Sequence, residues 1–196
     1  TLHCSSAASD VYKRQLDILH PKILNINKNN IDINLSEEKI KINIRGKNKE
    51  FFTKVGKTLS IILPSESNTS SSNENYDVLW LSPDEWMIYF DENKNSNVYD
   101  QLYKDISSLN FGSITDISSQ LICINIKGEN IFELLSSGSP FNFEKFKNDV
   151  GSSTQTIVNH IDVILHHKSK NNVNLFVRRS FSEHLYEWLV DSSNFV

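Results

Sequence analysis

The sequence has few cysteines, and this scarcity excludes two kinds of framework. Only Cys4 and Cys123 occur in the 196 residues. Two cysteines cannot build a disulfide scaffold, and by themselves they cannot complete the four-ligand shell of a structural zinc site. The count is typical of a reducing compartment, and we expect the protein to be cytoplasmic.

Long hydrophobic runs and an excess of positive charge are also missing. No apolar run approaches the roughly 20 residues that cross a bilayer, and no apolar leader with a cleavage site follows the first residues. Lys and Arg number 20 against 24 Asp and Glu, which gives a net charge of −4. Such a balance lacks the excess of positive charge that attracts a nucleic-acid backbone or an anionic membrane. We therefore expect neither among the partners.

The common chemical motifs are absent as well. The chain contains no G-x-G-x-x-G, G-x-x-x-x-G-K-[ST], G-x-S-x-G or H-E-x-x-H. His160 and His166 are six residues apart on one expected strand, about 20 Å, and cannot share a metal ion. We expect His160, His166 and His167 to be strand-surface residues, with His166 and His167 on opposite faces. Cys123 is expected to be a small structural residue and not a nucleophile.

What the sequence does contain is enough apolar material for a core. Hydrophobic residues make up 38% and aromatic residues 10% of the chain, which excludes the composition of a disordered protein. Asn, Ile, Lys and Ser are abundant, as in proteins from AT-rich genomes. Residues 1–15 follow neither a strand nor a helix period and are interpreted as a non-native, adaptor-derived tail.

A first lobe is expected over residues 16–109. Apolar and polar residues alternate over 31–35 and 40–44, which predicts two half-buried strands joined by a short turn. Segments 78–81 and 86–90 are predicted to form a hairpin around a type I turn. Apolar residues at helical spacing predict an amphipathic helix over 97–108.

A second lobe is expected over residues 110–196, without an internal sequence repeat. Its elements are strands, a helix that ends at Gly138 in a left-handed cap, and a final helix with a capping box at Ser180–Glu183. We expect Phe181, Leu185, Trp188 and Leu189 to form the apolar stripe of that helix. The predicted strands are 113–118, 121–127, 156–166 and 172–179. The pattern indicates an α+β protein made of two small antiparallel-sheet lobes with packed helices.

Two groups of residues have the composition of a protein interface. Trp80 and Trp86 flank the tight turn, and an Arg-Arg-Ser-Phe segment leads into the final helix. Aromatic residues and arginine are enriched at interfaces. An anion could bind ahead of the helix, although an interface or an internal ion pair is the commoner role for such arginines. The candidate interface or structural residues are Trp80, Pro83, Asp84, Glu85, Trp86, Arg178, Arg179, Ser180, Phe181 and Trp188. No catalytic, cofactor-binding or metal-binding residue is expected.

An ordered set of motifs resembles one known family. Residues 80–86, W-L-S-P-D-E-W, resemble the W-L-G-P-D-E-W motif of the gamma subunits of heterotetrameric sarcosine oxidases, with Ser82 in place of Gly. Four further segments are similar to family motifs in the same order: 115–118, 126–140, 154–156 and 177–189. Ser139 stands where the family has Cys. The resemblance covers about 78–189.

The resemblance implies a function that belongs to a complex. Such complexes demethylate sarcosine oxidatively to glycine, form hydrogen peroxide, and release the one-carbon unit as 5,10-methylenetetrahydrofolate or formaldehyde. FAD and FMN would be held by the beta subunit, NAD and tetrahydrofolate by alpha, and zinc by delta. This chain would bind no cofactor, contact alpha, beta and delta, and share the fold of the folate-binding domain of aminomethyltransferases.

Two other functions differ in class. One is a standalone folate-binding one-carbon transfer module of the aminomethyltransferase type, which rests on fold analogy alone. The other is an interaction protein of an unrelated pathway. Five motifs in the same order argue against the second.

Overall fold

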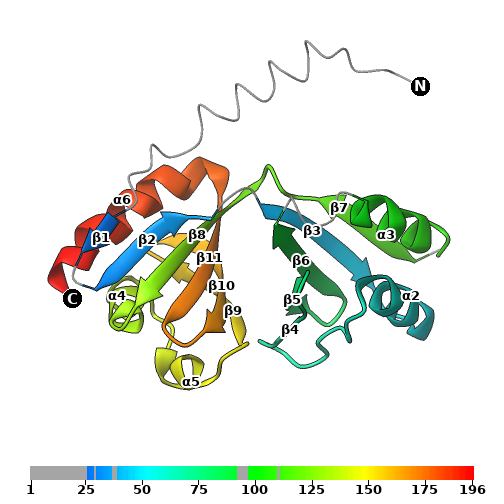
Figure 1. Ribbon diagram of the computed structural model, residues 1–196, viewed down its shortest axis with the longest axis horizontal. Coiled ribbons are helices and arrows are strands. Elements are labelled where there is room, and N and C mark those ends of the chain that lie inside the picture. Colours follow the sequence, from blue (N-terminus) through cyan, green and yellow to red (C-terminus); the bar gives the residue numbers. More distant parts are fainter. Residues whose placement is uncertain (1–25, 29, 37–38, 92–96, 110) are drawn as a thin grey trace, which may run out of the picture.

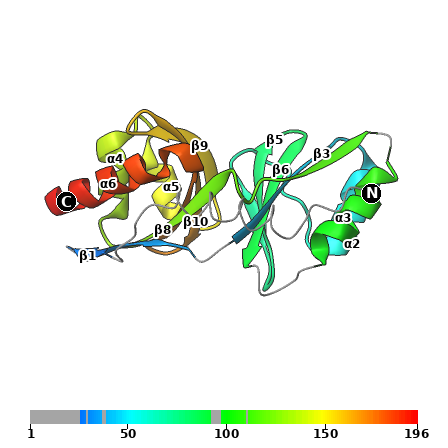
Figure 2. The same cartoon turned by 90° about the horizontal axis from the view of Figure 1, so that it is seen from above.

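Two antiparallel sheets with helices on their outer faces form the described part of the chain (Figure 1). The computed structural model describes residues 26–28, 30–36, 39–91, 97–109 and 111–196. The expected adaptor-derived tail, 1–15, lies outside these residues. Figure 2 shows the helices at the two ends of the molecule and the sheets between them. The α+β class expected from the sequence is confirmed.

The first sheet contains the expected hairpin and helix. Its strand order is β4-β5-β6-β3-β7, and α2 and α3 cover its outer face. Ile42, Ile44, Trp86 and Ile88 point toward these helices and are buried. The bounds are β3 (Lys39–Gly46), α2 (Lys49–Leu59), β4 (Ser70–Ser72), β5 (Asp77–Ser82), β6 (Glu85–Asp91), α3 (Val98–Ser107) and β7 (Gly112–Asp116).

The second sheet has six strands in the order β1-β2-β8-β11-β10-β9. Its outer face packs against α4, α5 and α6 through a cluster that includes Ile124, Leu135, Leu175 and Leu185. The bounds are β1 (Ile26–Lys28), β2 (Ile31–Leu35), β8 (Leu121–Gly128), α4 (Ile131–Gly138), α5 (Phe143–Asn148), β9 (Ser153–Val158), β10 (Ile161–Ser169), β11 (Asn172–Arg178) and α6 (Ser182–Ser192), with 3₁₀ turns η2 (Arg179–Phe181) and η3 (Ser193–Phe195).

The partner of β2 differs from the prediction. β2 pairs with β8, with Ile33 opposite Ile126, and not with β3. Alternation identifies a half-buried strand but does not say which strand lies beside it. The first lobe predicted from the sequence, 16–109, therefore includes two strands, β1 and β2, that belong to the second sheet.

Three further local predictions are corrected by turns and helices. The predicted strand 156–166 is two strands, β9 and β10, because Asn159 and His160 turn the chain at φ 48° and 63°. Helix α2 was not predicted, and Asn48 caps it by accepting a hydrogen bond from Phe51 N at 2.9 Å. Helix α5, which begins at Phe143, was not predicted either.

The final helix starts later than predicted and lacks the capping box. α6 begins at Ser182 after η2, and no side chain caps its first turn. Phe181 was expected to be part of the apolar stripe, but its side chain is 47% exposed. Leu185 and Leu189 are buried as expected. Gly138 has no positive φ. It is glycine for another reason: an added Cβ would lie 2.3 Å from Trp188 Cη2.

The two sheets repeat one topology. β3-α2-β4-β5-β6-α3 corresponds to β8-α4-α5-β9-β10-β11-α6, and β2 occupies beside β8 the place that β7 occupies beside β3. The sequence carries a trace of this repeat: residues 42–46, I-N-I-R-G, correspond to 124–128, I-N-I-K-G. The repeat is therefore one of topology, which the sequence analysis did not predict.

The inner faces of the sheets share a small core. Leu79, Met87 and Tyr89 from the first sheet pack against Cys123 and Phe176 from the second, and all five are buried. Thr69 and Ser152 form a bridge that joins the sheet edges. Within the described residues, none of the helices has the length and hydrophobicity needed to span a membrane.

Candidate functional site

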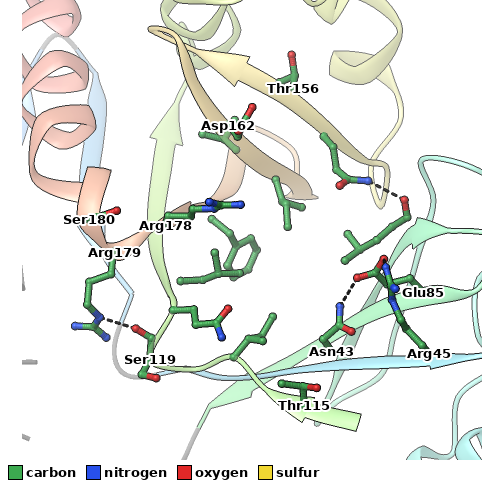
Figure 3. A pocket seen from close by; sticks show the side chains of 18 of the residues that line it. Asn43, Arg45, Glu85, Thr115, Ser119, Thr156, Asp162, Arg178, Arg179 and Ser180 are labelled. Atoms are coloured by element: carbon green, nitrogen blue, oxygen red, sulfur yellow. Dashed lines mark hydrogen bonds and ion pairs between the residues drawn. The ribbon is translucent and has the colours of Figure 1, made fainter. Parts of the chain in front are cut away.

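A cleft of about 1500 Å³ opens between the two sheets beside their shared core (Figure 3). We call it the inter-sheet cleft. Its first wall comes from β3, β5, β6 and β7, and its second wall from β8, β9, β10, β11 and η2. The cleft borders the buried inter-sheet core, and Phe176 belongs to both.

The first wall is polar. Asn43 and Arg45 on β3 and Ser113 and Thr115 on the neighbouring β7 line it. Asn43 Nδ2 donates to Glu85 Oε1 at 2.7 Å, and Arg45 forms an ion pair with the same carboxylate. The hydrogen bond to Glu85 raises the pKa of Arg45 above its usual value. The carboxylate of Glu85 is therefore already neutralised from within the wall.

The second wall is largely apolar. Leu121, Ile164 and Phe176 form part of it, and Ile157 adds a side chain that is 37% exposed. Gln155 on β9 crosses to the first sheet, where its Nε2 donates to Leu81 O at 2.7 Å. This bond closes one end of the cleft.

The two adjacent arginines point in different directions. Arg178 is exposed and projects into the inter-sheet cleft, whereas Arg179 turns away, and its Nε donates to Ser119 O at 2.7 Å (Figure 3). The separation follows from the backbone, because β11 ends at Arg178 and η2 begins at Arg179. Ser180 also lines the cleft and is exposed.

The two tryptophans of the hairpin do not line the cleft. Trp86 is 1% exposed, packs against Phe51 and Phe52, and donates Nε1–H to Pro64 O at 2.8 Å. It is a core residue of the first sheet. Trp80, directly opposite it in the hairpin, is half-buried against the same core.

The turn between the tryptophans is held by polar contacts. Asp84 accepts a hydrogen bond from Ser82 Oγ at 2.8 Å and lies 3.5 Å from Lys47 Nζ. The bond from Ser82, helped by Lys47, lowers the pKa of Asp84. Pro83 is exposed. These contacts shape the turn, and Leu81 and Glu85 are the residues of this motif that reach the cleft.

The remaining predicted residues lie elsewhere. Trp188 on α6 is half-buried against the outer core of the second sheet and covers Gly138. Exposed Phe181 is not among the lining residues. The structure thus brings Glu85, Arg178, Arg179 and Ser180 to one cleft and leaves the other six predicted residues outside it.

The expectation of surface histidines is wrong at two positions. His166 and His167 are each 1% exposed and lie on opposite faces of β10. His166 Nδ1 is 2.6 Å from the Tyr89 hydroxyl, and burial lowers its pKa to about 4. His167 Nδ1 is 2.9 Å from Phe146 O. His160 is exposed, but it lies in the β9–β10 turn and not on a strand.

Sequence reasoning missed the polar wall of the cleft. Asn43 and Arg45 alternate with Ile42 and Ile44, so the β3 pattern itself places them on the face opposite the core. That signal identifies the face, but it does not reveal that the face borders a cleft. The assembly of the wall with Gln155 depends on tertiary structure.

Cys123 has the character expected of a structural residue. It is 3% exposed, and burial raises the pKa of its thiol to about 11. A thiol with this pKa stays protonated near neutral pH and is a poor nucleophile. Within the described ranges, no three His, Cys, Asp or Glu side chains gather closely enough to hold a metal ion.

Sequence comparisons agree on one family. Residues 45–195 match the family model described as sarcosine oxidase, gamma subunit family. The sarcosine oxidase subunit gamma of Corynebacterium sp. (strain U-96) is 26% identical over 115 residues. That match covers 59% of this chain and 55% of the Corynebacterium subunit, so it spans little more than half of the relative's length.

Two solved structures share the fold. One is a chain of the heterotetrameric sarcosine oxidase from Corynebacterium sp. U-96 in complex with pyrrole 2-carboxylate, with a TM-score of 0.79 and 18% identity over 100% of this chain and 96% of that one. The other is glycine cleavage system aminomethyltransferase T from Bartonella henselae, with a TM-score of 0.63 and 10% identity over 83% of this chain and 46% of that one. The expected likeness to aminomethyltransferases is confirmed at the level of fold.

Proposed function

Because this chain belongs to the sarcosine oxidase gamma subunit family, we propose that it works as a non-catalytic subunit of a heterotetrameric sarcosine oxidase. The observation that carries the proposal is the family match over 45–195, which extends across both sheets. The likeness to a chain of the Corynebacterium heterotetramer supports it at the level of fold. Alpha, beta and delta subunits are the proposed partners.

The reaction is proposed for the whole complex. Sarcosine would be demethylated oxidatively to glycine, with hydrogen peroxide as a product and 5,10-methylenetetrahydrofolate or formaldehyde as the one-carbon product. FAD, FMN, NAD, zinc and tetrahydrofolate would be held by the other subunits. Cofactors would supply the redox chemistry, and this chain would support the subunits that hold them.

The chemistry of the described side chains supports a structural role. The His166 ring is bonded to Tyr89 and is neutral near pH 7, and the Cys123 thiol is buried and protonated. Neither group faces the inter-sheet cleft. The cleft is lined instead by arginines, amides and hydroxyls, which suit recognition better than bond cleavage.

A second candidate function follows from the fold shared with aminomethyltransferase T. The chain could be a folate-binding one-carbon transfer module. Fold similarity at 10% identity is a weak reason to infer activity, and the chain covers 46% of that transferase. We therefore rank it below the subunit function.

Co-expression tests the proposal directly. Residues 16–196 would be produced together with matching alpha, beta and delta subunits and recovered through a tag on this chain. We expect a yellow complex with flavin absorbance that consumes oxygen when sarcosine is added. A colourless monomer that binds tetrahydrofolate would overturn the subunit function and favour the one-carbon module.

A further inference from the structure

Arginine is concentrated in the inter-sheet cleft. The chain has four arginines and sixteen lysines. Arg14 lies outside the described residues, and the other three, Arg45, Arg178 and Arg179, all line the cleft. None of the described lysines lines it. Because lysine is the commoner basic residue of this sequence, the arginines of the cleft indicate a site where the planar guanidinium group is needed and an ammonium group would not suffice.

The three arginines are not equivalent. Arg45 is paired with Glu85, and Arg179 donates to Ser119 O. Arg178 has no hydrogen bond or ion pair with any residue that the structure describes. Its guanidinium projects into the cleft above an apolar wall (Figure 3). The planar, bidentate donor group of Arg178 is therefore available to a carboxylate from outside the chain.

The residues around Arg178 also favour the binding of a carboxylate. Phe176 and Ile164 lie on the same wall, and an apolar surface beside a guanidinium reduces solvent screening of an ion pair. Among the charged residues of the cleft, Arg45 and Glu85 neutralise each other and Arg179 turns away, which leaves Arg178 and Asp162. The chain as a whole has a net charge of −4. Arg178 is thus the unpaired cation that the cleft presents on an acidic protein.

The dimensions of the cleft favour a segment of protein chain over a small molecule. Small-ligand sites usually enclose about 300–1000 Å³, and this cleft measures about 1500 Å³. Many of its lining side chains are exposed, including Ser113, Gln155 and Ile157. One polar wall and one apolar wall resemble the mixed chemistry of a protein interface.

We propose that the inter-sheet cleft receives an extended segment of a partner subunit and that Arg178 binds an Asp or Glu carboxylate of that segment. The proposal rests on the proposed function, because it names the surface through which the chain would join its complex. Apolar side chains of the same segment would contact Ile157 and Ile164. Asn43 and Thr115 would offer hydrogen bonds from the opposite wall.

The test uses the complete complex. Wild-type chain, Arg178→Gln, Arg178→Glu and Arg178→Lys would be titrated onto the assembled alpha, beta and delta subunits, and the dissociation constant would be measured. Lys104→Glu is the matched control, since Lys104 is exposed on α3 and lies outside the cleft. Circular dichroism and thermal melting would verify that each variant is folded.

We expect Arg178→Gln to weaken assembly by about 30-fold or more, since breaking one desolvated charge pair typically has this effect. Arg178→Glu should weaken it further, because two negative groups would face each other. Arg178→Lys should fall between wild type and Arg178→Gln, because the charge remains but the bidentate geometry is lost. Lys104→Glu should stay within about twofold of wild type.

Three results would overturn the inference, and they differ from one another. Equal affinity of wild type and Arg178→Glu would show that the carboxylate does not bind there. Intact assembly of Arg178→Glu together with lost tetrahydrofolate binding would show that the cleft holds a small molecule. Failure of the wild-type chain to join the other subunits would contradict the proposed function itself.

Discussion

His166 links the two sheets through a directed chain of hydrogen bonds. Asn174 Nδ2 donates to the Tyr89 hydroxyl at 3.0 Å, and this hydroxyl lies 2.6 Å from His166 Nδ1. His166 Nε2 is 3.0 Å from Ser70 Oγ, which in turn donates to Gly151 O. These hydrogen bonds are mutually consistent when the Tyr89 hydroxyl donates to His166 Nδ1 and His166 Nε2 donates to Ser70 Oγ. A proton added to Nδ1 would oppose the Tyr89 donor.

This arrangement predicts a pH-dependent stability. Burial lowers the pKa of folded His166 to about 4, with Asp77 raising it and Lys168 lowering it, whereas unfolded histidine titrates near 6.5. Between these values the unfolded state binds more protons, so stability falls as pH drops from about 6.5 toward about 4. The difference in pKa corresponds to a free energy on the order of 3 kcal/mol.

Urea unfolding at pH 7 and pH 4.5 measures this contribution. We expect His166→Gln to lose about 1–3 kcal/mol at pH 7, because it disturbs buried hydrogen bonds, but to show a smaller further loss at pH 4.5 than wild type. His184→Gln is the control, since His184 is exposed on α6. An identical pH dependence for wild type and His166→Gln would contradict the prediction.

At the scale of elements, α4 and α6 meet at one glycine. An added Cβ on Gly138 would lie 2.3 Å from Trp188 Cη2 and 2.5 Å from Cζ2. The indole must therefore move, or the two helices must separate. Gly138→Ala should destabilise the protein by about 1–3 kcal/mol, the usual cost of overpacking. Urea unfolding measures it, and exposed Ser137→Ala on the same helix is the control.

A double-mutant cycle identifies the cause of this loss. Trp188→Leu removes the ring atoms that the alanine methyl would meet, so Gly138→Ala should cost much less in that background. Additive losses would show that the alanine acts through the backbone of α4 and not through its contact with α6.

At the scale of the whole molecule, the inner core makes the two sheets one stability unit. Phe176 is 1% exposed, and its ring centroid lies 4.8 Å from that of Tyr89 on the other sheet. The Thr69–Ser152 bridge joins the sheets through the backbone, and the Gln155 side chain adds a hydrogen bond to Leu81 O. We expect a single cooperative unfolding transition in the described part of the chain.

Tryptophan position makes this cooperativity measurable. Trp80 and Trp86 report on the first sheet and Trp188 on the second, so Trp188→Phe leaves fluorescence that follows the first sheet alone. In that background, Phe176→Ala should lower the fluorescence and circular-dichroism midpoints together, with a loss of about 3–5 kcal/mol. Phe195→Ala, at a position 88% exposed, is the control. Separate midpoints in the parent protein would contradict the single transition.

Local patterning was sufficient for much of the architecture. Alternation and turn chemistry predicted the 78–90 hairpin, and helical spacing predicted the α3 and α4 helices, because these signals depend on neighbouring residues alone. Helix α2 was missed, although its buried residues Phe51, Val55 and Leu59 recur at the same four-residue spacing as those of α3. The motif around Trp80 and Trp86, with those that follow it, was sufficient to predict the family, which the family match confirmed.

Long-range packing settled what patterning could not. The partner of β2, the burial of His166 and the divergence of Arg178 from Arg179 all depend on residues far away in the sequence. The inter-sheet cleft also depends on long-range packing, because its walls come from strands of two different sheets. These sheets meet at Phe176 and Met87, and the cleft opens beside that contact. Strand periodicity says which side chains share a face, and the free energy of burying that face against another decides what it meets.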